Sequence, residues 1–268
     1  MKILICGCGA MGGAILSGCL AKGLWKKEEV FLKEHSWEAS QEKAAAYGVQ
    51  VSRDGAEAAD ADLVILAVKP NVIPAAAKAL GAYAPKGTVI SIAAAVTLAQ
   101  LSSYFPEGTR IIRCMPNTPA SVGEGFTAIA PGAAAGEGDT KAAQAVFDAL
   151  GKSVVVSERQ VDELGALSGA GPGYAFVIID ALSDAGVNIG LPRKVAIEAA
   201  AQTLLGAAKM VLETGKHPAQ LRDGVTSPGG TTIAGIQVME RGGLRSALID
   251  GVEACMKKSD AMAKISAK

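Results

Sequence analysis

Short apolar runs alternate with helical patterns along the first 156 residues of the chain. The runs that predict strands are Lys2–Cys6, Val30–Leu32, Val49–Val51, Leu63–Val68, Thr88–Ile92, Arg110–Cys114, Thr127–Ala130 and Val154–Val156. Helices are predicted between them at Ala10–Lys22, Ser36–Tyr47, Val72–Ala84, Leu98–Phe105 and from about Thr140 to Leu150. Fully apolar strands separated by helices are typical of a sheet covered on both faces. We therefore expect an α/β fold with a doubly wound, mostly parallel sheet.

Strand signals end after Val156, and the rest of the chain shows helical patterns only. Helices are predicted at Val161–Leu167, Tyr174–Asp184, Pro192–Glu213, Pro218–Val225, Gly230–Arg241 and Leu244–Ala263. We place the domain boundary near Ser157, which gives an α/β domain of residues 1–157 and an all-helical domain of residues 158–268. Apolar helix faces this extensive often need a second subunit to cover them, so we expect an oligomer.

Composition excludes several classes of protein. The 268 residues carry 26 Lys and Arg against 26 Asp and Glu, so a nucleic acid is not an expected partner. The odd count of five cysteines argues against a disulfide framework and for a reducing cytoplasm, with the thiols acting as small buried hydrophobes. The chain has two histidines, and no ligand cluster has zinc spacing, so we expect no metal. The uncharged stretches Ile3–Ala21 and Gly87–Phe105 are interrupted by glycine or polar residues, which predicts strand followed by helix, not a membrane span.

A glycine fingerprint follows the first predicted strand. Gly7-Cys8-Gly9-Ala10-Met11-Gly12 fits Gly-x-Gly-x-x-Gly and opens a predicted helix. In such a loop the first glycine allows the tight turn, the second lets a pyrophosphate approach the backbone, and the third lets helix and strand pack closely. The anion then lies on the unpaired N–H groups of the helix. The fingerprint predicts a Rossmann dinucleotide site.

The end of the second predicted strand bears on the choice between NAD and NADP. A carboxylate at Glu34 can accept both adenosine ribose hydroxyls and would repel a 2′-phosphate, which favours NAD. Lys33, His35 and Ser36 could instead hold that phosphate if Glu34 points away. An exposed loop position without a cofactor contact is the alternative for His35. The sequence leaves these alternatives open.

Two further strand exits are candidates for the same site. Ala67-Val68-Lys69-Pro70 and Ser91-Ile92-Ala93-Ala94-Ala95 both follow carboxyl ends of predicted strands, where open α/β sheets bind ligands. Small residues there let a flat nicotinamide-ribose lie against the main chain. By residue type alone, a solvated loop lysine is the preferred interpretation of Lys69.

Residues Leu221–Gly235, which contain Thr-Ser-Pro-Gly-Gly-Thr-Thr, closely resemble the hallmark of pyrroline-5-carboxylate reductases. Three other passages agree with that resemblance: Val68–Pro70, Met115–Pro119 and Ser168–Tyr174. The similarity extends over essentially the whole chain. Departures occur at Ala95, where the family usually has Gly, and at Ala170, Gly173 and Gly224. None of them deletes a group that the chemistry requires.

The resemblance implies a Rossmann domain followed by an all-helical C-terminal dimerisation domain. It implies a homodimer, in this family often assembled further into decamers, that uses reduced NADP or NAD to convert the cyclic imine 1-pyrroline-5-carboxylate to L-proline, the last step of proline biosynthesis. The substrate would bind at the dimer interface beside the nicotinamide. Carried over by position, the substrate carboxylate would be held by Ser227, Gly230, Thr231 and Thr232. Thr232 would reach the ring nitrogen as the catalytic residue, and Glu158 matches another substrate-side position.

The predicted cofactor contacts combine the resemblance with the strand exits. They are Cys6, Gly7, Cys8, Gly9, Ala10, Met11, Glu34, His35, Ser36, Asp54, Ala67, Val68, Lys69, Pro70, Ile92, Ala93, Ala94 and Asn117. Two alternative functions remain. A 3-hydroxyacid-type dehydrogenase would need a general base near Pro172–Asp184, where no Lys or His stands out. A non-catalytic NAD(P)-binding protein would share the fold without the activity.

Overall fold

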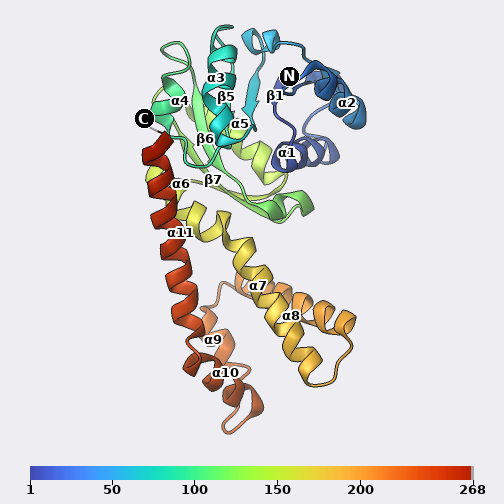
Figure 1. Ribbon diagram of the computed structural model, residues 1–268, viewed down its shortest axis with the longest axis vertical. Helices are drawn as coiled ribbons and strands as arrows, with labels where there is room; N and C mark the ends of the chain where they lie inside the picture. The colour runs from blue at the N-terminus through green and yellow to red at the C-terminus, as the bar shows by residue number, and fades with distance from the viewer. Residues whose placement is uncertain (267–268) are drawn as a thin grey trace. The chain divides into compact units, whose positions relative to one another are not determined.

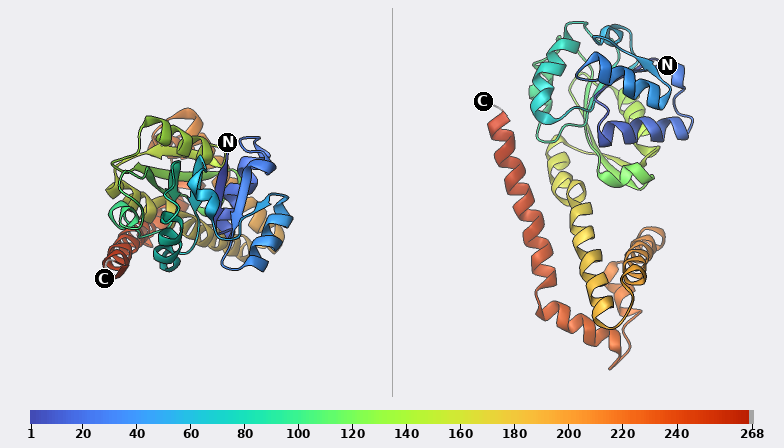
Figure 2. Two further views of the ribbon diagram at one scale, coloured as in Figure 1. Left: turned by 90° about the horizontal axis from the view of Figure 1, so that it is seen from above. Right: turned by 45° about the vertical axis from the view of Figure 1, so that its right-hand side comes forward.

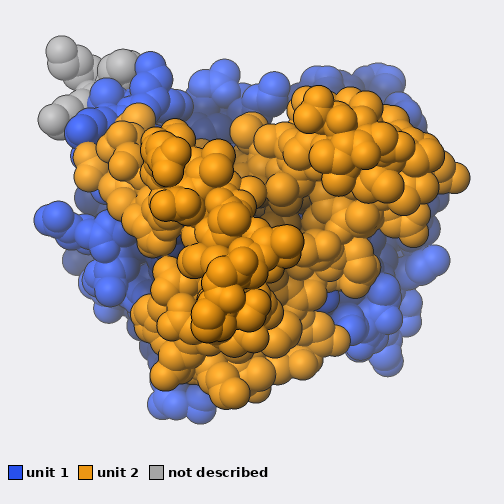
Figure 3. All heavy atoms as spheres, turned by 90° about the horizontal axis from the view of Figure 1, so that it is seen from below, with its two compact units in different colours: residues 1–170, 255–268 blue, residues 171–254 orange. Residues whose placement is uncertain are grey.

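The computed structural model describes residues 1–266, and they form two compact units. Unit 1 comprises Met1–Ala170 together with the chain from Cys255 onward, and unit 2 comprises Gly171–Ala254. Figure 3 colours unit 1 blue and unit 2 orange. The boundary expected after residue 157 stays a prediction. The two compact units meet after Ala170 instead, because α6 (Glu158–Leu164) packs on strands β6 and β7 and so belongs to unit 1.

Unit 1 is built on one eight-stranded sheet in the order β3-β2-β1-β4-β5-β6-β7-β8 (Figure 1). Its strands are β1 (Ile3–Cys6), β2 (Val30–Lys33), β3 (Gln50–Val51), β4 (Leu63–Leu66), β5 (Thr88–Ser91), β6 (Ile111–Met115), β7 (Gly125–Pro131) and β8 (Gly151–Val155). All neighbours pair in parallel except β6 and β7, which are antiparallel. The link between these two strands holds only the short helix η4 (Thr118–Val122), and a parallel return would require a longer crossover. The expected doubly wound, mostly parallel sheet is confirmed.

Helices cover both faces of the sheet (Figure 2), and alternate residues of each central strand enter opposite layers of core. Ile3 and Ile5 of β1 pack with α1 (Ala10–Ala21), α2 (Trp37–Tyr47) and α5 (Glu137–Asp148). Leu4 and Cys6 pack in the second layer with α3 (Ile73–Gly81) and α4 (Leu98–Ser102). Because side chains of a strand point alternately to its two faces, a sheet covered on both sides needs the unbroken apolar runs seen in the sequence.

The predicted elements of unit 1 are present, with shifted ends. The N-cap expected at Ser36 is confirmed, since its Oγ accepts a hydrogen bond from the Ala39 N–H at 3.1 Å, and α2 ends before Gly48 in the left-handed region. The helix predicted to reach Ala84 ends at Gly81, where any Cβ would lie 2.3 Å from the Tyr104 carbonyl oxygen. Short helices η1 (Lys27–Glu29), η2 (Ala56–Ala59) and η3 (Pro70–Val72) were not predicted, and the helix predicted at Val161–Leu167 runs on into η5 (Gly165–Gly169).

Unit 2 is helical, as expected. It contains α7 (Gly171–Asn188), α8 (Arg193–Thr214), α9 (Pro218–Asp223), α10 (Thr231–Arg241) and the start of α11 (Leu244–Ser266). Helices α7 and α8 pack against each other, and Gly186 permits this approach because a Cβ there would lie 2.8 Å from the Ala196 Cβ. The loop joining them is braced by Arg193, which donates to the Ser183 Oγ and pairs with Asp184 at 2.6 Å.

Much of the apolar surface of unit 2 is uncovered. Glu158–Asn188 and Arg193–Thr214 are long and apolar enough to cross a membrane by length and composition alone. Only 6% and 11% of their most apolar windows are buried inside this single chain. A soluble oligomer and a membrane protein would both show such faces, so the nature of the covering surface must come from other observations.

Candidate dinucleotide and carboxylate sites

A cavity of about 750 Å³ opens at the carboxyl ends of β1, β2 and β4. The strand order reverses direction between β1 and β4, and ligands of open α/β sheets bind at such a switch point. The cavity is lined by Cys6, Gly7, Cys8, Gly9, Lys33, Glu34, His35, Ala39, Lys43, Ala67, Val68, Lys69, Val72, Ala75, Ala76 and Ala79. Nine of these were predicted as cofactor contacts, so the structure brings the glycine loop, the β2 exit and the β4 exit together.

The glycine loop has the geometry that a pyrophosphate requires. Gly7 has a φ of +93°, and a Cβ there would lie 2.8 Å from the Val68 Cγ1. A Cβ on Gly12 would lie 2.3 Å from the Gly7 carbonyl oxygen, whereas one on Gly9 would meet no atom within 4 Å. Gly9 is the N-cap of α1 and supplies no side-chain cap. The first turn of α1 therefore faces open space with its N–H groups free of a side-chain acceptor, an arrangement suited to a phosphate.

Glu34 is held against this loop. Its Oε1 accepts a hydrogen bond from the Cys8 N–H at 2.5 Å, and its Oε2 accepts from the His35 N–H at 3.3 Å. The Glu34 side chain is 16% exposed, while the His35 side chain is 82% exposed. Ser36 is not among the residues that line the cavity, and its Oγ accepts a hydrogen bond from the Ala39 N–H as the N-cap of α2. The carboxylate therefore points into the site. The sequence had left open whether Glu34 points into the site or away from it.

Two buried cysteines lie at the floor of the cavity. Burial raises the pKa of the Cys6 thiol to about 11. Burial also raises the pKa of Cys8, with a further contribution from the Glu34 carboxylate. Both thiols are therefore protonated at neutral pH and poor nucleophiles. Their place is structural, as expected for small hydrophobes; Cys255 is the exception to the expected burial, being only half-buried.

Other predicted cofactor contacts lie outside the residues that line this cavity. Ala10 lines an adjoining hollow of about 360 Å³ that shares Cys8, Gly9 and Lys43 with it. The outlying set comprises Met11 in α1, Ser36, Asp54, Pro70, Ile92, Ala93, Ala94 and Asn117. Ile92–Ala94 follow β5, the next strand of the same sheet edge, so they continue the rim. These roles stay predictions.

Asn117 and Asp54 have partners within the protein. The Asn117 Nδ2 donates to the Ser168 carbonyl oxygen at 3.0 Å, and its Oδ1 accepts from the Phe126 N–H. This amide ties η5 to β7. Asp54 accepts a hydrogen bond from the Ala56 N–H at 3.0 Å and stands at the start of η2.

Several lining residues were missed by the sequence analysis. Lys43 belongs to α2, and Ala75, Ala76 and Ala79 belong to α3. The signal for the alanines was available: they form a small-residue face on the helix that directly follows the predicted exit at Lys69-Pro70. Lys43 had no local signal, because its place in the site depends on how α2 packs beside the glycine loop.

Glu158 lies in a network beside the β5 exit. Its Oε1 accepts from the Leu98 N–H at 2.6 Å and lies 3.3 Å from the Arg113 Nη1. Arg113 is 2% exposed and also pairs with Asp162, and its Nε has no hydrogen-bond partner among the described residues. Glu158 thereby joins β6, α6 and the first residue of α4. A contact between Glu158 and substrate stays a prediction.

The predicted substrate residues of unit 2 come together in one turn. The Gly230 N–H donates to the Ser227 carbonyl oxygen at 3.0 Å, and Gly229 has a φ of +69°. Gly230 is the N-cap of α10 and offers no side-chain cap to the N–H groups of Thr231 and Thr232. Thr231 and Thr232 are exposed. The turn presents main-chain donors and two hydroxyls to a small anion.

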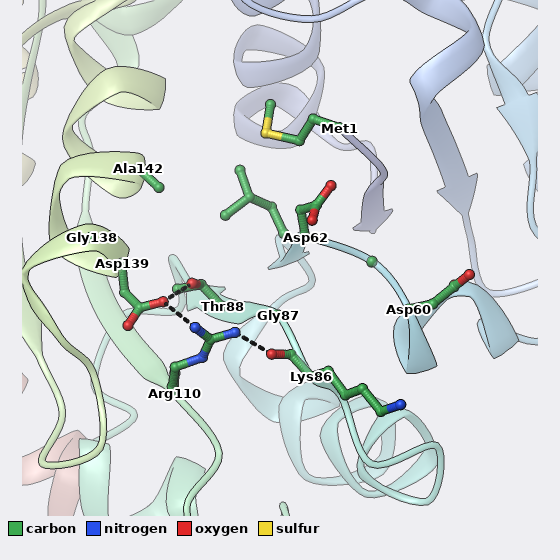
Figure 4. A pocket seen from close by; sticks show the side chains of 12 residues that line it. Met1, Asp60, Asp62, Lys86, Gly87, Thr88, Arg110, Gly138, Asp139 and Ala142 are labelled. Carbon is green, nitrogen blue, oxygen red and sulfur yellow. Dashed lines mark hydrogen bonds and ion pairs between the residues drawn. The ribbon is translucent and has the colours of Figure 1, made fainter.

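A second hollow, of about 400 Å³, lies at the amino ends of β4 and β5, away from the dinucleotide cavity (Figure 4). Within it, Arg110 pairs with Asp139 at 3.3 Å and donates to the Lys86 carbonyl oxygen, and Thr88 donates to the same Asp139. No group of three or more His, Cys, Asp or Glu positioned to hold a metal ion occurs within the part of the chain that the structure describes. The carboxyl edge is therefore the better candidate for a ligand site.

Two sequence families match this chain. Residues 158–262 match the family described as pyrroline-5-carboxylate reductase dimerisation. Residues 2–95 match the family described as NADP oxidoreductase coenzyme F420-dependent. The first match covers unit 2, and the second covers β1 to β5 with the glycine loop and the rim of the cavity.

Whole-chain relatives agree with these matches. The chain is 43% identical to a pyrroline-5-carboxylate reductase from Synechocystis sp., over 98% of this chain and 99% of the relative. It is 39% identical to that of Escherichia coli, over 98% of both chains. Its structure resembles a pyrroline-5-carboxylate reductase from Coxiella burnetii with a TM-score of 0.90 and 35% identity, over 97% of this chain and 98% of the other. A Plasmodium falciparum pyrroline carboxylate reductase with NADP bound gives 0.86 at 29% identity, over 98% of both chains. The chain belongs to the pyrroline-5-carboxylate reductase family.

Proposed function

We propose that this chain reduces 1-pyrroline-5-carboxylate to L-proline with NADPH or NADH as hydride donor. The observation that carries the proposal is the Ser227–Thr232 turn, whose main-chain donors have no side-chain cap, in a chain that also holds a dinucleotide cavity. One feature fits an amino-acid carboxylate and the other fits a nicotinamide cofactor. Family membership supports the pairing of the two.

The cofactor fits the residues that are present. The space that a Cβ on Gly7 would fill, the free first turn of α1 and the carboxylate of Glu34 correspond to the tight turn, the pyrophosphate and the ribose. When bound, the reduced nicotinamide supplies a hydride to the carbon of the C=N bond. Gly7, Gly9 and the N–H groups of α1 would hold the pyrophosphate, and the exits of β4 and β5 would flank the nicotinamide side.

The turn at α10 would position the imine. The N–H groups of Thr231 and Thr232 would bind the substrate carboxylate, and the Thr232 hydroxyl can accept a hydrogen bond from the protonated ring nitrogen. A protonated iminium is already a strong electrophile, so the reaction needs position more than an ionisable catalyst. This accounts for an imine reductase whose turn carries threonines and glycines instead of His or Lys.

A hydroxyacid dehydrogenase is less well supported. Oxidation of an alcohol needs a general base, and α7, the first helix of unit 2, carries no Lys or His. Its titratable side chains are Tyr174, Asp180 and Asp184, and Asp184 pairs with Arg193.

A second copy of the chain is the proposed cover for the apolar faces of unit 2. The dimerisation family spans residues 158–262 and so includes the uncovered faces of α7 and α8. We propose a homodimer, with decamers as its possible higher assembly, in the cytoplasm and not in a membrane. Unpaired thiols at all five cysteines support a reducing compartment. Sedimentation of the detergent-free protein tests the assembly: a monomer would contradict it.

The activity is tested by mixing the protein with 1-pyrroline-5-carboxylate and either NADH or NADPH while following 340 nm and the L-proline formed. We expect loss of absorbance matched mole for mole by L-proline. A protein that binds the cofactor but leaves the imine unreduced would be a non-catalytic binding protein, and the proposal would fail.

A further inference from the structure

We infer that this enzyme prefers NADH over NADPH, and that the Glu34 carboxylate sets the preference. The inference rests on the proposed function and goes beyond it, because NADP is bound in the relative from Plasmodium falciparum and the fold by itself admits the 2′-phosphate. The choice then falls to the residues at the end of β2.

Glu34 has little freedom to leave the site. Its two carboxylate oxygens accept hydrogen bonds from the Cys8 and His35 N–H groups, and Cys8 is 3% exposed. Swinging the side chain out would strip the Cys8 N–H of its acceptor at a buried position. The carboxylate is therefore held in one position in the lining of the cavity, where the glycine loop meets the end of β2.

A fixed carboxylate distinguishes the two cofactors by chemistry. An ionised carboxyl group offers about four acceptor sites, and two are used by the main chain. The remaining sites can accept from the 2′- and 3′-hydroxyls of an adenosine ribose. A 2′-phosphate has no such donor and carries a charge of about −1.5 to −2, so it would be repelled at close range.

Basic side chains also reach this cavity, which is lined by Lys33, His35, Lys43 and Lys69, and two of them are already engaged beside Glu34. The Lys33 Nζ donates to the Glu34 carbonyl oxygen at 3.3 Å, and its chain packs on Gly55. Ser36 caps α2 and does not line the cavity. Lys43 and His35 line the cavity, but the His35 Nδ1 lies 3.6 Å from the Glu34 Oε2. Removal of the carboxylate would leave these basic side chains around the same cavity and create a site for the phosphate.

Binding of ADP-ribose and 2′-phospho-ADP-ribose, measured by calorimetry, tests the inference without the reaction. We expect the unmodified protein to bind ADP-ribose at least about tenfold more tightly, which corresponds to about 1.4 kcal/mol. In Glu34→Gln the amide oxygen still accepts from Cys8 but lacks the charge, and the ratio should fall toward one. In Glu34→Ser the ratio should invert. Steady-state kcat/KM for NADH and NADPH should follow the same order.

Glu38→Gln is the matched control, because Glu38 is an exposed carboxylate in the first turn of α2 and does not line the cavity. It removes the same charge and should leave the ratio unchanged. Equal or tighter binding of the phosphorylated probe by the unmodified protein overturns the preference and leaves the proposed function intact. A ratio that falls equally in Glu38→Gln overturns the role of Glu34, since general charge would explain it. Failure of both probes to bind contradicts the dinucleotide site and with it the proposed function.

Discussion

The two units bury their apolar side chains to very different degrees. In unit 1, Leu4 and Ile65 of the central strands are 0% exposed, whereas in unit 2 Val177 of α7 and Ile189 just after it are 70% and 79% exposed. Both regions have strongly apolar sequences, so hydrophobicity alone does not tell them apart. Unit 1 covers its apolar residues with its own helices, while the pattern in unit 2 suits a surface that another chain completes. The first unit can therefore be tested by packing and ligand binding, and the second by assembly.

The largest effect is expected at Gly12 of unit 1. In Gly12→Ala the new Cβ would lie 2.3 Å from the Gly7 carbonyl oxygen, so either α1 or the glycine loop must shift. We expect the free energy of unfolding to fall by about 1–3 kcal/mol and NAD(P) binding to be lost. Urea denaturation and calorimetry measure the two effects.

Gly9→Ala is the matched control within the same loop. Its Cβ would meet no atom of the described residues within 4 Å, so the free energy of unfolding should fall only by the cost of alanine at the N-cap of α1, about 0.5–1 kcal/mol. The methyl group would nonetheless stand where a pyrophosphate approaches, and affinity for NAD(P) should fall at least about tenfold. If Gly9→Ala bound the cofactor normally, the pyrophosphate would not lie over this loop.

A charge introduced on α7 tests whether the exposed apolar face of unit 2 is a subunit interface. Val177→Glu should dissociate the oligomer, because a buried unpaired carboxylate is costly at a subunit interface. Sedimentation velocity measures the assembly. Val122→Glu is the control, since Val122 in η4 of unit 1 is 75% exposed. We expect it to leave assembly unchanged; if both variants dissociated, or neither did, the distinction between the units would be wrong.

The hydroxyl of Thr232 should contribute to the reaction and not to the fold. Thr232 is exposed in the single chain, so Thr232→Ala should leave the free energy of unfolding unchanged. Loss of a hydrogen bond to a charged ring nitrogen should lower kcat/KM for the imine by about tenfold or more. Thr232→Ser keeps the hydroxyl and should retain most of the activity. Unchanged kinetics in Thr232→Ala would remove this residue from the mechanism.

Glu158 offers a smaller and more discriminating test. Glu158→Gln keeps an acceptor for the Leu98 N–H but loses the charge opposite Arg113. We expect the free energy of unfolding to fall by about 1 kcal/mol, held low because the side chain is 34% exposed and Arg113 retains Asp162. Glu163→Gln, in an exposed pair with Arg159, is the control. A raised KM for the imine at unchanged stability would support the predicted substrate contact instead.

The sheet and the glycine site were predictable because their signals are local. Apolar runs such as Leu63–Val68 and the spacing of Gly7, Gly9 and Gly12 each depend on a few neighbouring residues. The antiparallel pairing of β6 with β7 was not predictable in this way. It depends on the nine-residue link between the two strands, which is too short for a parallel crossover. Lys43 entered the site for a similar reason, through the packing of α2.

Side-chain direction was the second limit on prediction. The residue type at Glu34 allowed two cofactors, and only the hydrogen bond from the Cys8 N–H showed which way the carboxylate points. Glu158 and Asn117 were placed by resemblance at the site, whereas their recorded partners are Arg113, Leu98, Ser168 and Phe126 within unit 1. Leu98, Arg113 and Ser168 lie 45 to 60 residues away from these side chains in the sequence, so such contacts leave no periodic signal.

The smallest effect is expected at Ala95, in the loop after β5. This position tests whether the β5 exit takes part in the cofactor site of unit 1. Ala95 has a φ of +58° in the loop after β5, and Ala84 has a φ of +48° before it. The left-handed conformation costs a residue with a Cβ about 1–2 kcal/mol, and glycine removes this cost. Glycine also loses more backbone entropy on folding, which offsets part of the stabilisation. Ala95→Gly and Ala84→Gly should therefore each raise the free energy of unfolding by up to about 1 kcal/mol. Ala84 lies at the other end of β5 from the β5 exit, so only Ala95→Gly should also change the affinity for NAD(P), measured by calorimetry beside the melting curves. Unchanged affinity in Ala95→Gly as well would contradict a contact between the β5 exit and the cofactor, and would leave the glycine loop and the exits of β2 and β4 as its site in unit 1.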